Sequence, residues 1–179
     1  MRIPPGTAAA LALAACGATP PAAPLANTGS TTALTFTELR FYIGPQLVEK
    51  LHDDGTIEVA LRVGDWETFG RIDARGAAFR ADGTRLGYLA SDGTFRRPSG
   101  EPGSWKLIGE TLMFPDGPVP ERSRKLIQLT IDARGVLQGF ADADPSYPSY
   151  KFEGLTDRGS RRAALYMYAI VLTGRYEPR

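Results

Sequence analysis

The single histidine and the single cysteine decide which kinds of catalytic or metal site this chain could build. His52 is followed by Asp53, Asp54 and Gly55, which is typical of a turn. Nucleophilic catalysis with histidine needs a nucleophile and an orienting acid beside the imidazole, and no serine lies in a Gly-x-Ser-x-Gly sequence. The usual zinc sites need several histidine or cysteine ligands, so one of each is too few. We therefore expect His52 to be a turn residue among solvated acidic neighbours, and we predict no metal site.

Acidic side chains could act as calcium ligands or as a pair of catalytic carboxylates. Asp142 and Asp144, followed by Pro145 and Ser146, form the densest group of oxygen ligands, but no loop resembles an EF-hand. Paired carboxylates hydrolyse glycosides when they lie at the right separation. The sequence does not show which acids are that close, so a hydrolase acting on envelope polymers stays open as an alternative. Its candidate residues are Glu58, Asp65, Glu67, Asp73 and Glu110.

Aromatic side chains could form a surface that binds a sugar or a peptide. Residues 146–150 (SYPSY) are typical of an exposed aromatic loop. In small β domains, however, aromatic side chains also pack in the core or at the edge of a sheet. Both interpretations stay open for the candidate binding residues, which are Trp66, Trp105, Tyr147 and Tyr150.

The charge balance and the glycine patterns exclude several other functions. The chain has 21 basic and 20 acidic side chains, so it has no excess of positive charge to attract nucleic acid. It contains neither a Gly-x-x-x-x-Gly-Lys sequence nor a dinucleotide fingerprint before a helix. We therefore predict no nucleic-acid partner, no cofactor and no catalytic residues.

The N-terminus has the pattern of an export signal that ends at a cysteine. Arg2 precedes an apolar run at residues 8–15, which is far shorter than the roughly 20 residues that span a bilayer. The sequence Leu13-Ala14-Ala15-Cys16 resembles the lipobox of bacterial lipoproteins. The resemblance implies that residues 1–15 are a signal peptide that is removed, and that Cys16 carries the lipid, with acyl chains such as palmitate. It places the protein in the cell envelope, held to a membrane through Cys16. Gly17 stands where an aspartate would act as an inner-membrane retention signal, which favours the outer membrane in a diderm host.

The composition divides the rest of the chain into a tether and one domain. Residues 16–33 are rich in Ala, Pro, Thr, Gly and Ser and carry no charge, so they cannot bury enough apolar surface to fold. We expect a flexible tether over 16–33 and a single β-rich domain over 34–179. That domain contains no cysteine, so its stability depends on its core and not on disulfides.

Alternating apolar residues and frequent turns predict that the domain is mainly β. Residues 56–63 and 125–131 alternate with a period of two, and residues 34–43 do so with one slip, as a bulge would allow. Asp-Gly pairs recur at 54–55, 82–83, 92–93 and 116–117, where tight hairpins need a positive φ. This spacing favours an antiparallel meander that forms a small barrel or a sandwich. Ile-Asp-Ala-Arg-Gly occurs at 72–76 and at 131–135, either as a duplicated motif or because strand-turn-strand units have similar sequences.

The C-terminal segment departs from this rhythm. We predict a helix that Ser160 caps and Gly174 ends, packed against the sheet or inside a barrel. A last buried strand over residues 166–173 is the alternative, because Tyr, Ile, Val and Thr favour strands. Together these features predict a lipid-anchored envelope protein with a non-catalytic binding or structural domain, whose partner is an envelope protein or polymer. Two alternatives remain, a barrel that carries a small hydrophobic ligand and the carboxylate-dependent hydrolase.

Overall fold

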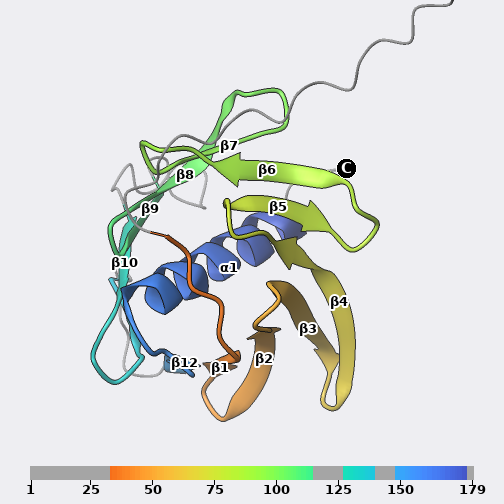
Figure 1. Ribbon diagram of the computed structural model, residues 1–179. Coiled ribbons are helices and arrows are strands. Elements are labelled where there is room, and N and C mark those ends of the chain that lie inside the picture. Colours follow the sequence, from red (N-terminus) through yellow and green to blue (C-terminus); the bar gives the residue numbers. More distant parts are fainter. Residues whose placement is uncertain (1–32, 115–126, 140–147, 177–179) are drawn as a thin grey trace, which may run out of the picture.

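A computed structural model describes residues 33–114, 127–139 and 148–176, which form twelve β-strands and one α-helix (Figure 1). The chain is thus mainly β with a C-terminal helix, as the sequence predicts. The predicted signal peptide, Cys16 and Tyr147 lie outside the described residues, as do Asp142 and Asp144. The strands are β1 (Leu39–Ile43), β2 (Gln46–Leu51), β3 (Thr56–Arg62), β4 (Asp65–Ile72), β5 (Ala77–Arg80), β6 (Arg85–Leu89), β7 (Thr94–Arg96), β8 (Pro102–Ile108), β9 (Thr111–Phe114), β10 (Ile127–Ile131), β11 (Leu137–Gln138) and β12 (Tyr150–Glu153), and the helix is α1 (Arg158–Tyr176).

The strands form one antiparallel meander that nearly closes into a barrel. Each strand from β1 to β11 pairs with the next along the chain, and β12 returns to pair with β1. The two ends of this order, β11 and β12, approach each other through an isolated bridge between Val136 and Lys151. The slip that the sequence shows between Phe36 and Leu39 lies before β1 begins, whereas the register shift of β1 against β2 lies between Phe41 and Tyr42. Of the two predicted architectures, the structure is therefore the barrel.

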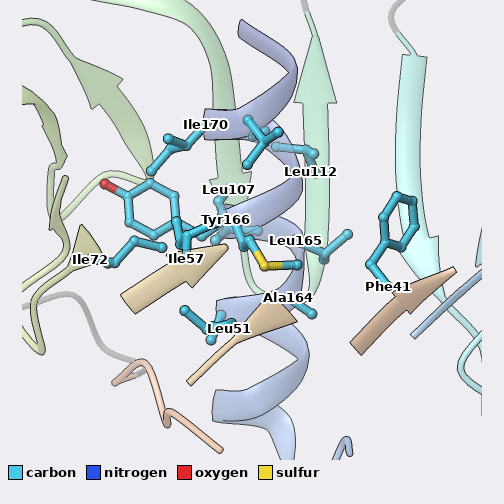
Figure 2. Close-up of a cluster of buried hydrophobic side chains, with 14 of the residues drawn as sticks. Phe41, Leu51, Ile57, Ile72, Leu107, Leu112, Ala164, Leu165, Tyr166 and Ile170 are labelled. Atoms are coloured by element: carbon cyan, nitrogen blue, oxygen red, sulfur yellow. The ribbon is translucent and has the colours of Figure 1, made fainter. Parts of the chain in front are cut away.

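Helix α1 lies inside the curve of the sheet (Figure 1). Its residues 163–167 (AALYM) are completely buried. Figure 2 shows Leu165 and Tyr166 of α1 among apolar side chains of different strands, including Ile57, Ile72 and Leu107. Because strands surround the helix, its apolar residues are needed on every side and not along one stripe. The alternative of a last strand over residues 166–173 is therefore wrong, because enclosure by the sheet outweighs the strand preference of Tyr, Ile and Val.

Both ends of α1 differ in detail from the prediction. Asp157 is the capping residue, and its Oδ1 accepts a hydrogen bond from the Ser160 amide at 2.7 Å. Ser160 Oγ accepts in return from the Asp157 amide at 3.0 Å, so Ser160 is the second half of a capping box and not the cap. Gly174 does not end the helix, which continues to Tyr176. A Cβ at Gly174 would lie 2.6 Å from the Phe69 ring, so this glycine allows close packing of α1 on β4.

The two Ile-Asp-Ala-Arg-Gly segments form the same turn. In each turn the glycine amide donates to the aspartate carbonyl, at 2.9 Å from Gly76 to Asp73 and at 3.0 Å from Gly135 to Asp132. The aspartate Oδ1 also accepts two further amides in both turns. The turns at 52–56, 80–84, 90–94 and 97–101 have the same backbone hydrogen bonds with other sequences. The repeated pentapeptide thus forms a turn that other sequences of this chain form as well.

Antiparallel order places alternate turns at opposite ends of the barrel. We call the end with the turns that contain Gly55, Gly76, Gly93, Gly109 and Gly135 the capped end, because α1 also begins there. We call the end with the turns that contain Gly44, Gly64, Gly83 and Gly100 the open end.

Candidate binding surface

The three aromatic candidates that the structure describes, Trp66, Trp105 and Tyr150, do not come together in one site. Trp105 is completely buried and stacks on Phe95, with ring centroids 4.6 Å apart. Its indole ring is therefore part of the core, and the packing interpretation replaces the binding interpretation at this position. Tyr150 is partly buried and stacks on Phe41 at 6.2 Å. Trp66 in β4 lies four strand positions from Tyr150 in β12, or about 19 Å at the usual strand spacing.

Trp66 is the candidate whose surroundings look like a binding surface. Its side chain is partly buried on the outer face of β4, and it pairs in register with Ala60 of β3. The Lys50 ammonium lies over the indole ring, 3.7 Å from the ring centroid. Lys50 Nζ also lies 3.3 Å from Glu58 Oε2, in an ion pair directly across strands β2 and β3. A cation above an indole ring is attracted by the negative face of the ring, so Lys50 is held by two contacts.

His52 extends this group of side chains toward the capped end. Its Nε2 lies 3.2 Å from Glu58 Oε2, and its Nδ1 lies 3.2 Å from Glu38 Oε1. The residues Glu38, His52, Glu58, Lys50 and Trp66 therefore form a continuous series of contacts, which we call the Trp66 row. The row combines an indole ring with alternating positive and negative groups on the outer face of the barrel.

The row shifts the pKa values of its ionisable groups. Burial on its own would lower the pKa of His52, but the two carboxylates outweigh it and raise the pKa above its usual 6.5. The hydrogen bond from His52 and the contact with Lys50 lower the pKa of Glu58. His52 is thus a turn residue as expected, but its acidic partners are Glu58 of β3 and Glu38, which precedes β1. Neighbouring Asp54 instead accepts a hydrogen bond from the Thr56 amide at 2.8 Å. Strand register alone could have predicted the Lys50–Glu58 pair, whereas Glu38 gives no sequence signal.

A shallow groove of about 230 Å³ lies at the seam between β11 and β12. Three basic side chains, Arg134, Lys151 and Arg161, line it. Lys151 Nζ already pairs with Glu153 Oε1 at 2.9 Å, and Arg161 donates to the backbone carbonyl of Asp132 at 2.9 Å. Arg134 lies 3.3 Å from a carboxylate oxygen of Asp132. Acceptors of this chain hold these cations, as they do Lys50, but the only aromatic side chain lining the groove, Phe152, is buried, so the groove is a weaker candidate than the Trp66 row.

The acidic side chains of the structure serve mainly as structural acceptors. Six of them have a lowered pKa, which is the opposite of what a general acid needs; they are Asp54, Glu58, Asp82, Asp92, Asp132 and Glu153. Among the hydrolase candidates, Asp73 accepts two turn amides and Glu110 pairs with Arg158 at 3.1 Å. Within the described ranges, no three His, Cys, Asp or Glu side chains are placed to hold a metal ion.

Comparisons with known proteins give no relative from which a function could be transferred. The chain matches no protein-family model, no curated protein and no solved structure. In the part of the chain that the structure describes, no helix has the length and apolar character needed to cross a membrane.

Proposed function

We propose that this protein is a lipid-anchored component of the bacterial cell envelope, and that its β barrel binds an envelope polymer without catalysing a reaction. The observation that carries the proposal is the Trp66 row, in which an indole ring, an ammonium and two carboxylates lie together on the outer face. Once Lys50 moves off the indole ring, the ring can pack against the apolar face of a sugar ring, and Lys50 and Glu58 can hydrogen-bond to the polar groups of the sugar. A polymer that combines sugar rings with carboxylates, such as peptidoglycan, offers partners for all three side chains.

The N-terminal sequence supports the lipid anchor. Residues 13–16 (LAAC) resemble a lipobox, and Cys16 is the only cysteine in the chain. Acyl chains on a cysteine hold a protein to a bilayer at about 0.8 kcal/mol for each buried methylene group. On this proposal the protein lies in the cell envelope, at the outer membrane in a diderm host.

The packing of α1 gives no support to the alternative of a hydrophobic-ligand carrier. Such a barrel needs an apolar cavity, and here Leu165, Tyr166 and Ile170 of α1 occupy the space between the inward faces of the strands (Figure 2). The lowered carboxyl pKa values likewise give no support to the hydrolase.

The anchor is tested by the intact mass and the detergent partitioning of the natively expressed protein, beside a Cys16→Ser variant. We expect a mature chain that begins at Cys16 with added acyl mass. We also expect the variant to leave the membrane fraction. A mature chain that begins elsewhere, with Cys16 removed or unmodified, would disprove the anchor.

The binding surface is tested by co-sedimentation of the Cys16→Ser protein with purified peptidoglycan sacculi. In that background, Trp66→Ala should reduce the bound fraction at least fivefold. The matched control is Tyr88→Ala on β6, where a partly buried ring also lies beside a cation, with Arg85 4.9 Å from its centroid. Equal losses in both variants, or a protein that does not sediment, would refute the proposed polymer.

A further inference from the structure

The tip of the β3–β4 hairpin exposes apolar side chains, whereas two of the other three turns of the open end are polar. Leu61 is 60% exposed and Val63 is 90% exposed. Among the described residues, only one other large apolar side chain is comparably exposed, Ile108 at 51%. The open-end turns over residues 81–84 (ADGT) and 97–101 (RPSGE) have polar sequences, whereas the β1–β2 turn contains Ile43, Gly44 and Pro45. Turn sequences are usually rich in Gly, Asn, Asp and Ser, so valine at the tip is unexpected on structural grounds alone.

This hairpin extends beyond the part of the barrel that α1 fills. Along one face of β3, Ile57 is 1% exposed and Val59 is 5% exposed, but Leu61 is 60% exposed. A Cβ at Gly64, in the turn itself, would meet no atom within 4 Å. Figure 1 shows the hairpin as a separate projection next to β2. The apolar tip therefore stands free of the rest of the described structure.

We propose that the tip of the β3–β4 hairpin inserts Leu61 and Val63 into the surface of the bilayer that holds Cys16. Arg62 lies between these two side chains and is exposed, so its guanidinium could contact headgroup phosphates. Trp66 follows on β4, and tryptophan is enriched at the boundary between headgroups and acyl chains. The combination of apolar tip, cation and indole fits a lipid surface.

The reach of the predicted tether agrees with this contact, which rests on the proposed lipid anchor. The described chain begins at Ala33 and enters β1 from the capped end, whereas the hairpin tip lies at the open end. The seven residues of β3 span about 23 Å between these ends. Residues 17–33 would have a root-mean-square length of roughly 20–25 Å as a flexible chain. A flexible tether of this length, as the sequence predicts, would reach the open end without being stretched.

The contact would fix the orientation of the barrel. The open end would face the bilayer, and the capped end would face away from it. The Trp66 row would then begin at the membrane with Trp66 and run outward to Glu38. A polymer bound to the row would thus lie beside the bilayer surface.

The test uses the two tryptophans as reporters in phospholipid vesicles whose acyl chains carry bromine. The vesicles contain three parts phosphatidylethanolamine to one part phosphatidylglycerol, about the mixture of an anionic bacterial membrane. Bromine quenches only an indole that reaches the membrane, and Trp105 is completely buried. We expect quenching in the lipidated protein, and none in Trp66→Phe. The double variant Leu61→Asp and Val63→Asp should reduce the quenching at least fivefold. Ile108→Asp, at the capped end, should leave it unchanged.

The Cys16→Ser protein in the same vesicles separates this inference from the proposed anchor. Quenching of Trp66 that the hairpin variant removes, in a chain without lipid, would support the tip contact even if Cys16 is never acylated. A protein that is incorporated through its lipid but whose Trp66 is not quenched would overturn the tip contact and leave the anchor standing. Equal quenching in the hairpin variant and in Ile108→Asp would also overturn it.

Discussion

The two ends of the barrel share one kind of turn but differ in what surrounds it. At the capped end, the carbonyls of Gly55, Gly76, Gly93 and Gly135 each accept an amide from the strand that follows the hairpin in the chain, at 2.7–2.9 Å. At the open end, Gly64, Gly83 and Gly100 have no atom within 4 Å of an added Cβ, whereas the Gly44 amide donates to the Ser149 carbonyl at 2.8 Å. Four of the five turns at the capped end are thus cross-linked through their glycine carbonyls, and three of the four at the open end are free hairpin tips.

Helix α1 strengthens this difference because its polar side chains bind turns of the capped end. The Tyr166 hydroxyl donates to the Gly76 carbonyl, and the Arg162 guanidinium donates to the Gly109 carbonyl. Arg161 donates to the Ile131 and Asp132 carbonyls at 3.1 and 2.9 Å. Three separate turns are thereby attached to one buried helix. The open end can then project an apolar hairpin because the fold does not depend on it.

The largest expected effect comes from an alanine at the capped end. Gly135 has φ +83, and a Cβ there would lie 2.2 Å from the Phe152 carbonyl oxygen. Gly135→Ala must therefore displace backbone and weaken the bond from the Phe152 amide to the Gly135 carbonyl. We expect a loss of at least about 3 kcal/mol in the free energy of unfolding, measured by urea denaturation.

Gly83→Ala is the matched control at the open end. Gly83 has φ +84 in the same class of turn, but nothing lies within 4 Å of the added Cβ. Only the cost of a positive φ remains, which is about 1–2 kcal/mol. Equal losses in the two variants would mean that the capped end is no more tightly packed than the open end.

The next effect concerns the attachment of α1 to the rim. Tyr166→Phe removes the hydroxyl that donates to the Gly76 carbonyl inside the core. That carbonyl keeps the Leu89 amide at 2.9 Å, so we expect a loss of about 1 kcal/mol in the free energy of unfolding. The control Tyr88→Phe, beside Arg85 on β6, should change stability by less than about 0.5 kcal/mol. A Tyr166→Phe protein as stable as the control would show that the bond does not hold the helix to the rim.

The sequence predicts the strands and turns well because both depend on local patterns. The alternation in residues 56–63 corresponds to β3, and three of the four Asp-Gly pairs correspond to the turns at Gly55, Gly83 and Gly93. The fourth pair, at 116–117, lies outside the described residues. The helix was predictable from its length and its continuous apolar run. Its exact ends were not, because the choice between Asp157 and Ser160 as the cap depends on reciprocal hydrogen bonds.

The candidate site was less predictable because it depends on contacts between distant strands. Trp66 and Trp105 are the same residue type on two strands, yet one lies on the outer face and the other in the core beside Phe95 and Tyr166. Glu38 is the partner of His52 with the larger separation in the sequence. It precedes β1, and no spacing rule relates it to His52. The exposure of Val63 follows from the length of the hairpin relative to the filled core.

The smallest expected effect is a pH dependence of the free energy of unfolding that comes from His52. This residue makes polar contacts on the outer face, near the capped end. Because the two carboxylates raise its pKa in the folded state, protonated His52 stabilises the fold below its usual pKa of 6.5. That contribution is lost as the pH rises through the raised folded pKa.

The stability difference between the wild type and His52→Gln should therefore shrink between about pH 5.5 and about pH 8. The side chain is 31% exposed, so solvent screening keeps the effect below about 1 kcal/mol, and salt should reduce it further. Thermal unfolding of both proteins across this range measures it. A difference that grows with pH would mean that His52 is neutral when folded and does not join Glu38 to Glu58.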